Sequence, residues 1–182
     1  MGGTARASSE QFKERIFPVG QLKPLDSPMN LKVGDKAPDF KLPSLSGEEV
    51  SLSQFLGSKN VVISFVPAAW TPVCSEQWPG YNIVKDLFDR NQAALIGITV
   101  DNLATLYAWT QQMGGVWFHV LSDFWPHGEV ASMYGVLRTG GTSERALFVI
   151  DRKGIVRYVD VHDINERPRL EDLAEALQKL EK

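Results

Sequence analysis

Residues 60–74 read Asn-Val-Val-Ile-Ser-Phe-Val-Pro-Ala-Ala-Trp-Thr-Pro-Val-Cys. The first part of this stretch is rich in β-branched and apolar residues, which predicts a strand buried on both faces of a parallel sheet. Pro67 ends that strand, and a short loop follows it. Pro72 then has the fixed φ that suits the first turn of a helix. The stretch therefore predicts a strand, a loop and a helix that starts close to Cys74.

From Leu31 onward, short β-rich runs alternate with longer amphipathic ones, which is typical of an α/β fold. We expect further strands over 49–52, 93–100, 116–121, 145–151 and 155–161, and helices over 72–90, 103–113, 127–134 and 170–181. Pro79 and Gly80 predict a break in the first helix, and residues 151–154 predict a tight turn between the last two strands. The expected fold is a central mixed β-sheet flanked by helices, parallel at first and finished by an antiparallel pair.

The chain has 182 residues, enough for one domain with a sizeable core. Residues 1–30 are polar and interrupted by glycine and proline, so we expect a partly ordered N-terminal extension before a domain over 31–182. A net charge of -3 leaves no basic excess, which disfavours nucleic acid as a partner. No apolar run approaches the roughly 20 residues that cross a bilayer, and the first ten residues lack the apolar core of a signal peptide. We expect a cytoplasmic protein that does not bind membranes.

Cys74 is the only cysteine of the chain. It cannot form a disulfide within its own chain, and a thiolate metal site needs several such ligands, so we expect neither a metal nor another cofactor. In the first turn of a helix, unpaired backbone N–H groups favour a thiolate over a thiol. This position also lies at the carboxyl edge of the predicted sheet, where open α/β folds build their sites. The alternative is a buried, inert thiol.

The spacing of Pro67, Thr71 and Cys74 resembles the active-site motif of the peroxiredoxins, which runs proline, three residues, threonine or serine, two residues, cysteine. Three further segments resemble the opening of that family, the segment before its last strands, and the strand that begins with its essential arginine: Val33–Phe40, Tyr134–Val136 and Arg145–Asp151. The resemblance covers about residues 31–182. It implies a thioredoxin-like fold and a compact, one-cysteine type of peroxiredoxin.

The resemblance also implies an activity, the reduction of hydrogen peroxide or organic hydroperoxides through a sulfenic acid on Cys74. Thr71 would hydrogen-bond the thiolate or the bound peroxide, and Pro67 would shield the sulfur from bulk water. Arg145 would pair with the thiolate and stabilise the charge that develops on the peroxide oxygens. Gln77 occupies a position where the family carries Glu or Gln to orient that arginine.

Trp70, Val73 and Gln77 are the residues that we expect beside the substrate. Arg138 is the alternative to Arg145, since both lie near the same glycine-containing loop, but only Arg145 opens a predicted strand. For Trp70 and its neighbour Trp78, packing is the alternative interpretation.

A single cysteine implies an external reductant, either a low-molecular-weight thiol or a thioredoxin-like protein, because no second thiol is present to resolve the sulfenic acid. Members of the family usually dimerise, so we expect a homodimer. A thioredoxin-type oxidoreductase is disfavoured, because Thr71 stands at the first position of the Cys-x-x-Cys motif. A glutathione-peroxidase-like enzyme matches the spacing and Arg145 less well. A thioredoxin-like binding or scaffold domain with an inert thiol is the remaining alternative.

Overall fold

The computed structural model describes residues 17–18 and 20–180. Its main feature is a five-stranded sheet with the strand order β5-β4-β3-β6-β7. The strands are β3 (Asn60–Phe65), β4 (Ala93–Thr99), β5 (His119–Ser122), β6 (Arg145–Ile150) and β7 (Val156–His162). β3 pairs in parallel with β4, which pairs in parallel with β5, whereas β6 is antiparallel to both β3 and β7. The expected mixed sheet is therefore confirmed.

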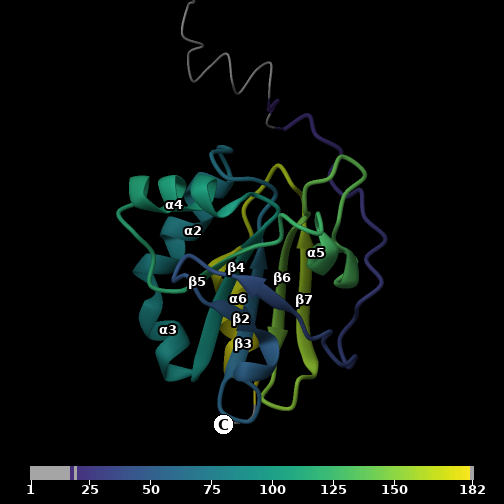
Figure 1. The fold of residues 1–182 in the computed structure, drawn as a ribbon. Helices are drawn as coiled ribbons and strands as arrows, with labels where there is room; N and C mark the ends of the chain where they lie inside the picture. Colours follow the sequence, from purple (N-terminus) through teal and green to yellow (C-terminus); the bar gives the residue numbers. More distant parts are fainter. Residues whose placement is uncertain (1–16, 19, 181–182) are drawn as a thin grey trace, which may run out of the picture.

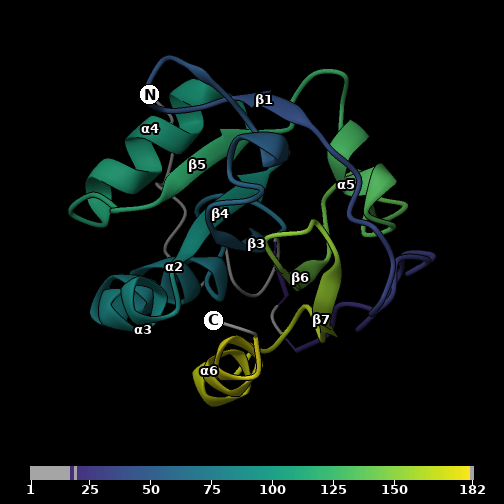
Figure 2. The same ribbon diagram turned by 90° about the horizontal axis from the view of Figure 1, so that it is seen from below.

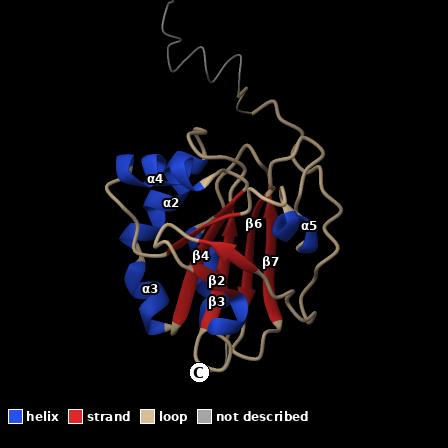
Figure 3. Cartoon of the chain, in the orientation of Figure 1, coloured by secondary structure: helices blue, strands red, loops and turns tan. Residues whose placement is uncertain are grey.

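Both faces of this sheet are covered (Figures 1, 2 and 3). One face carries α2 (Cys74–Ile83), α3 (Lys85–Arg90), α4 (Leu103–Gln112) and α6 (Leu170–Gln178). The other face carries α5 (Glu129–Met133), a short 3-10 helix (Leu52–Gln54), and a two-stranded sheet of β1 (Lys41–Pro43) and β2 (Glu49–Ser51). Successive residues of β3 alternate between the two cores: Ile63 belongs to the α5 side and Val62 to the α2 side.

The helix expected over 72–90 is two helices, and the break does not lie where the proline predicts it. α2 continues through Pro79, and the chain leaves the helical conformation at Val84, where φ is -107° and ψ is 27°. Trp78 and Tyr81 on either side of the proline are almost fully buried against the sheet. Their packing outweighs the one backbone hydrogen bond that the proline removes.

The strand expected over 116–121 starts only at His119. Gly114 and Gly115, both with positive φ, turn the chain just before it. The Trp117 indole N–H then donates to the Tyr81 carbonyl at 3.1 Å, which directs this segment to α2. The tight turn before β7 is confirmed, since the Gly154 N–H donates to the Asp151 carbonyl at 2.9 Å.

Residues 1–16 and 19 of the expected extension lie outside the described part of the chain. The described remainder, up to residue 30, forms no helix or strand but is bonded to the domain. For example, the Met29 N–H donates to the Gly135 carbonyl at 2.9 Å. None of the helices that the structure describes is both long and apolar enough to cross a lipid bilayer.

Candidate active site

The loop between β3 and α2, residues 67–73, is held by groups at the ends of the neighbouring strands. The Asp101 carboxylate, just past β4, accepts the Ala69 N–H at 2.7 Å and the Thr99 hydroxyl at 2.6 Å. Just before β6, the Ser143 hydroxyl donates to the Val66 carbonyl at 3.0 Å. Because these partners belong to the rigid sheet, the loop presents Cys74 at a defined place on its carboxyl edge.

Cys74 begins α2, and its sulfur faces the guanidinium of Arg145. The Cys74 Sγ lies 3.5 Å from both terminal nitrogens of Arg145, and both residues are fully buried. Arg145 opens β6, which pairs with β3, and this pairing brings together two side chains that are distant in the sequence. Of the two candidate arginines, the structure therefore places Arg145 at the sulfur.

All five N–H donors of the Arg145 guanidinium have partners. Two point at the Cys74 sulfur. Two reach the Ile164 carbonyl, from Nε at 3.4 Å and from a terminal nitrogen at 3.1 Å. The last reaches the Gln77 side-chain oxygen at 2.7 Å. The guanidinium plane is thus fixed by three groups, of which only the sulfur is able to react.

Gln77 is a buried partner of the Arg145 guanidinium. It is 2% exposed, and its amide nitrogen donates to the Tyr81 hydroxyl at 3.0 Å and to the Ser64 hydroxyl at 3.2 Å. Its bond to Arg145 suits a residue that orients the guanidinium, and the expectation that it contacts substrate stays a prediction. Burial raises the pKa of the Tyr81 hydroxyl, so this hydroxyl stays neutral and remains a stable partner.

The charge of Arg145 has no acidic partner. Among the described residues, no Asp or Glu side chain forms an ion pair with this guanidinium, although it is fully buried. A buried charge is costly unless it is paired. Among the groups bonded to Arg145, the Cys74 sulfur is the one that is able to carry a negative charge.

Thr71 lies in the loop before Cys74, but its hydroxyl proton is already used. The Thr71 hydroxyl donates to the Ala68 carbonyl at 2.8 Å. It therefore does not donate to the thiolate in this structure, which corrects one of its two expected roles. Its oxygen keeps lone pairs that are able to accept a hydrogen bond from a peroxide O–H group.

The other loop residues divide into buried and exposed ones. Pro67 and Val73 are buried. Trp70 is 43% exposed, with a φ of 66° in the left-handed region. Cys74 itself is fully buried.

Trp78 and His127 contact other parts of the fold. The Trp78 ring stacks on Trp109 with centroids 4.8 Å apart, and a Cβ at Gly97 would lie 2.6 Å from the Trp78 ring. His127 bonds the Gly141 carbonyl at 2.6 Å, away from the sulfur. Within residues 17–18 and 20–180, no group of His, Cys, Asp and Glu side chains is arranged to hold a metal ion.

Two groups that hold the site, Asp101 and the Ile164 carbonyl, are not predicted from the sequence. Asp101 could have been found from the sequence, because it is a polar residue directly after a predicted buried strand. The Ile164 carbonyl could not, since a backbone acceptor has no side-chain signature.

Comparison with known proteins identifies the family of this chain. The family model for the AhpC/TSA family matches residues 33–159. Alkyl hydroperoxide reductase E of Mycobacterium tuberculosis is 36% identical over 137 residues, which are 75% of this chain and 89% of that protein.

Two solved structures have the same fold. The reduced 2-Cys peroxiredoxin of Plasmodium vivax matches with a TM-score of 0.75 and 28% identity, over 81% of each chain. Peroxidoxin BcpB of Mycobacterium tuberculosis matches with a TM-score of 0.74 and 27% identity, over 84% of this chain and 100% of that one. The expected thioredoxin-like fold is therefore confirmed, and the chain belongs to the AhpC/TSA family, the peroxiredoxins.

Proposed function

We propose that this protein is a thiol peroxidase that reduces hydrogen peroxide or organic hydroperoxides, with Cys74 as its redox-active residue. The observation that carries this proposal is the Cys74 sulfur, 3.5 Å from both terminal nitrogens of a buried arginine that forms no ion pair with a carboxylate of residues 17–18 and 20–180. Membership of the AhpC/TSA family supports it, as does the relative that is named alkyl hydroperoxide reductase E.

The oxidative step uses the Cys74 thiolate as the nucleophile. Its sulfur attacks one peroxide oxygen, so that an S–O bond forms while the O–O bond breaks. The sulfur is oxidised by two electrons to a sulfenic acid, and the peroxide is reduced. The leaving hydroxide or alkoxide takes up a proton and departs as water or an alcohol.

Arg145 acts on the charge that moves during this step. Negative charge passes from the sulfur to the leaving oxygen, and a fixed guanidinium beside both atoms stabilises it without reorganisation. One preorganised donor of this kind contributes roughly 2.7 to 4 kcal/mol to a transition state. Thr71 accepts a hydrogen bond from the peroxide O–H, since its own proton is held by the Ala68 carbonyl.

Access to the sulfur requires a local movement, because Cys74 is fully buried. We propose that part of the loop 67–73 moves while the bond from Ala69 to Asp101 persists. The exposed Trp70 lies in this loop. Local opening of such a segment costs far less than global unfolding.

The reductive half of the cycle needs an external thiol. A thiol attacks the sulfenic sulfur, releases water and leaves a mixed disulfide with Cys74. A second thiol then regenerates the Cys74 thiolate by exchange. A thioredoxin-type protein or a low-molecular-weight thiol is the reductant that we propose.

We also propose that the protein forms a homodimer in the cytoplasm. Trp70, Phe124 and Trp125 are 43%, 50% and 81% exposed and follow the carboxyl ends of β3 and β5. Such exposed aromatic side chains on one sheet edge suit an interface. A lone free thiol suits a reducing compartment.

The proposed activity is tested by following peroxide consumption in the presence of thioredoxin or of a low-molecular-weight thiol. Wild-type protein should consume peroxide catalytically with at least one of these reductants. The Cys74→Ser variant should fold but leave the peroxide unchanged. Equal, background-level consumption by both proteins would instead favour a scaffold with an inert thiol.

A further inference from the structure

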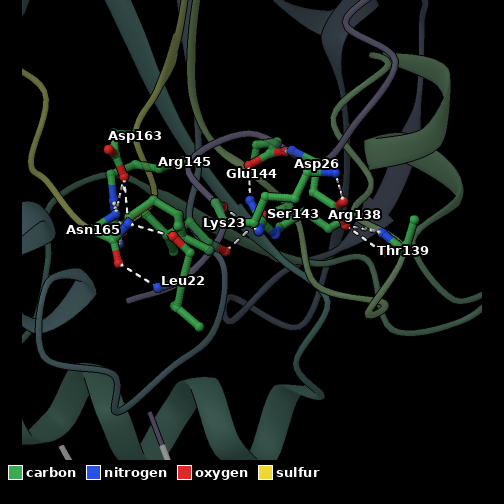
Figure 4. A network of polar contacts seen from close by, with 12 residues as sticks. Leu22, Lys23, Asp26, Arg138, Thr139, Ser143, Glu144, Arg145, Asp163 and Asn165 are labelled. Carbon is green, nitrogen blue, oxygen red and sulfur yellow. Dashed lines mark hydrogen bonds and ion pairs between the residues drawn. The ribbon is translucent and has the colours of Figure 1, made fainter. Parts of the chain in front are cut away.

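The segment Gly20–Asp26, which we call the N-terminal strap, takes no part in the chemistry proposed above. It has no helix or strand and lies across the domain surface, where it is drawn in purple (Figure 1). Figure 4 shows that it contacts two parts of the chain on either side of Arg145. Each of these contacts holds a group next to, or bonded to, the active-site arginine.

The first contact is with the loop that follows β7. The Asn165 side-chain oxygen accepts the N–H groups of Gly20 at 2.9 Å and of Leu22 at 3.2 Å. Its amide nitrogen donates to the Leu22 carbonyl at 3.0 Å. The neighbouring Ile164 N–H donates to the Pro24 carbonyl at 3.2 Å. The strap thus holds Ile164 and Asn165 in this loop.

Ile164 connects this contact to the active site. Its N–H is held by the strap, and its carbonyl accepts two of the five N–H groups of Arg145. The position of the guanidinium therefore depends on a loop that the strap anchors, because the loop has left the β6–β7 ladder at His162. A loop without ladder hydrogen bonds needs other partners to stay in one place.

The second contact is at the residue directly before Arg145. The buried Glu144 carboxylate accepts the Asp26 N–H at 2.6 Å and forms an ion pair with Arg138 at 2.5 Å. The Arg138 guanidinium also donates to the Lys23 carbonyl at 2.7 Å. The strap is therefore bonded in two places near Arg145. One is the loop after β7, and the other is Glu144, directly before the start of β6.

We propose that the N-terminal strap is a positioning element for Arg145 in the peroxide reaction, and that Asn165 is the positioning residue through which it acts. This inference rests on the proposed function, because it concerns the same arginine and the same reaction. An error of about 1 Å in a reacting group costs up to roughly 100-fold in rate. The strap therefore contributes to the rate without touching the sulfur or the substrate.

The test is a double-mutant cycle on the full-length protein. The rate constant for oxidation of Cys74 by hydrogen peroxide is measured by mass spectrometry of quenched samples, for Asn165→Ala, Arg145→Ala and the double variant. Asn60→Ala is the matched control, because it also removes a side-chain bond to a backbone carbonyl, that of Asn91 at 3.1 Å, at the opposite end of β3. Circular dichroism confirms that each variant is folded.

We expect Asn165→Ala to slow oxidation roughly 10- to 100-fold when Arg145 is present, and less than about threefold when Arg145 is already alanine. Asn60→Ala should leave the rate unchanged. A wild-type rate for Asn165→Ala, or an equal loss in both backgrounds, would overturn the proposal. If Asn165→Ala does not fold, Asn165→Asp takes its place, because it keeps the oxygen that accepts the two strap N–H groups. Its oxidation rate should fall less than that of Asn165→Ala, and again only when Arg145 is present. Failure of the proposed function itself appears separately, as wild-type protein that peroxide does not oxidise.

Discussion

Arg138 and Arg145 lie close together in the sequence and are both largely buried, but they have opposite kinds of partner. Arg138 pairs with the carboxylate of Glu144 at 2.5 Å, so its charge is neutralised. Arg145 bonds a backbone carbonyl, a neutral amide and the Cys74 sulfur. The first arrangement stabilises the fold, whereas the second leaves a positive charge that only an ionised thiol, or a reacting peroxide, is able to balance. Burial alone therefore does not distinguish the two arginines, whereas their partners among the described residues do.

Replacing Arg145 should have the largest effect on the reaction. We expect Arg145→Ala to slow the oxidation of Cys74 by roughly 100- to 1000-fold, the usual cost of losing one preorganised donor. Loss of thiol ionisation explains only part of this, because returning an acidic cysteine to ordinary behaviour changes its ionised fraction at neutral pH by roughly 30-fold. Stopped-flow kinetics combined with the thiolate absorbance measures both quantities. A rate loss fully accounted for by the ionised fraction would reject this role for Arg145.

Replacing Arg138 should affect stability more than rate. Arg138→Ala leaves the Glu144 carboxylate buried without its ion-pair partner, which costs about 3 kcal/mol of unfolding free energy. Denaturant titration measures that loss. The rate of peroxide oxidation per folded molecule should fall far less than for Arg145→Ala, and a comparable fall would contradict the division between the two arginines.

Gln77→Glu gives Arg145 the kind of partner that Arg138 already has. A carboxylate at this position neutralises part of the guanidinium charge and so disfavours ionisation of Cys74. We expect a smaller thiolate fraction at neutral pH and a rate lower by less than about tenfold, because the new oxygen still orients the arginine. Ultraviolet titration of the thiolate, with Cys74→Ser as the blank, checks this. A thiolate fraction that rises in Gln77→Glu is the contrary result.

The smallest effect concerns the strap at low pH. Hydrogen bonds from the Lys23 ammonium and from Thr139 hold the pKa of the Asp26 carboxyl well below its usual range. A lowered pKa stabilises the fold above the unfolded value of about 4, and this stabilisation is lost as the pH falls further. Unfolding measured at several pH values below about 5 should therefore show a shallower decline for Asp26→Asn than for wild type. Parallel declines would mean that Asp26 contributes nothing to this pH dependence.

The two arginines also show what a sequence is able to predict. The motif of Pro67, Thr71 and Cys74 is local in the sequence. The apolar run directly before it predicts the strand that precedes the motif. A pattern of residue types places Arg145 at the start of a strand, but only the resemblance to a family connects it to the thiol. The partners of the two guanidinium groups depend on tertiary pairing, which no local pattern contains.

The remaining differences have the same physical origin. The helix break lies at Val84 rather than at Pro79, because burial of Trp78 and Tyr81 outweighs a local preference. The burial of Gln77 and the engaged hydroxyl of Thr71 follow from neighbours that the fold brings in. The Ile164 carbonyl belongs to the backbone, so no residue type marks it.

In the proposed reaction, the Cys74 sulfur beside Arg145 takes one oxygen atom from a peroxide. Intact-protein mass spectrometry after one equivalent of hydroperoxide measures this directly. We expect the wild-type protein to gain a single oxygen, located on Cys74, and this reaction to be complete while Arg145→Ala is still largely unmodified. Wild-type protein that keeps its original mass, or that gains its oxygen on a methionine while Cys74 stays reduced, would contradict it.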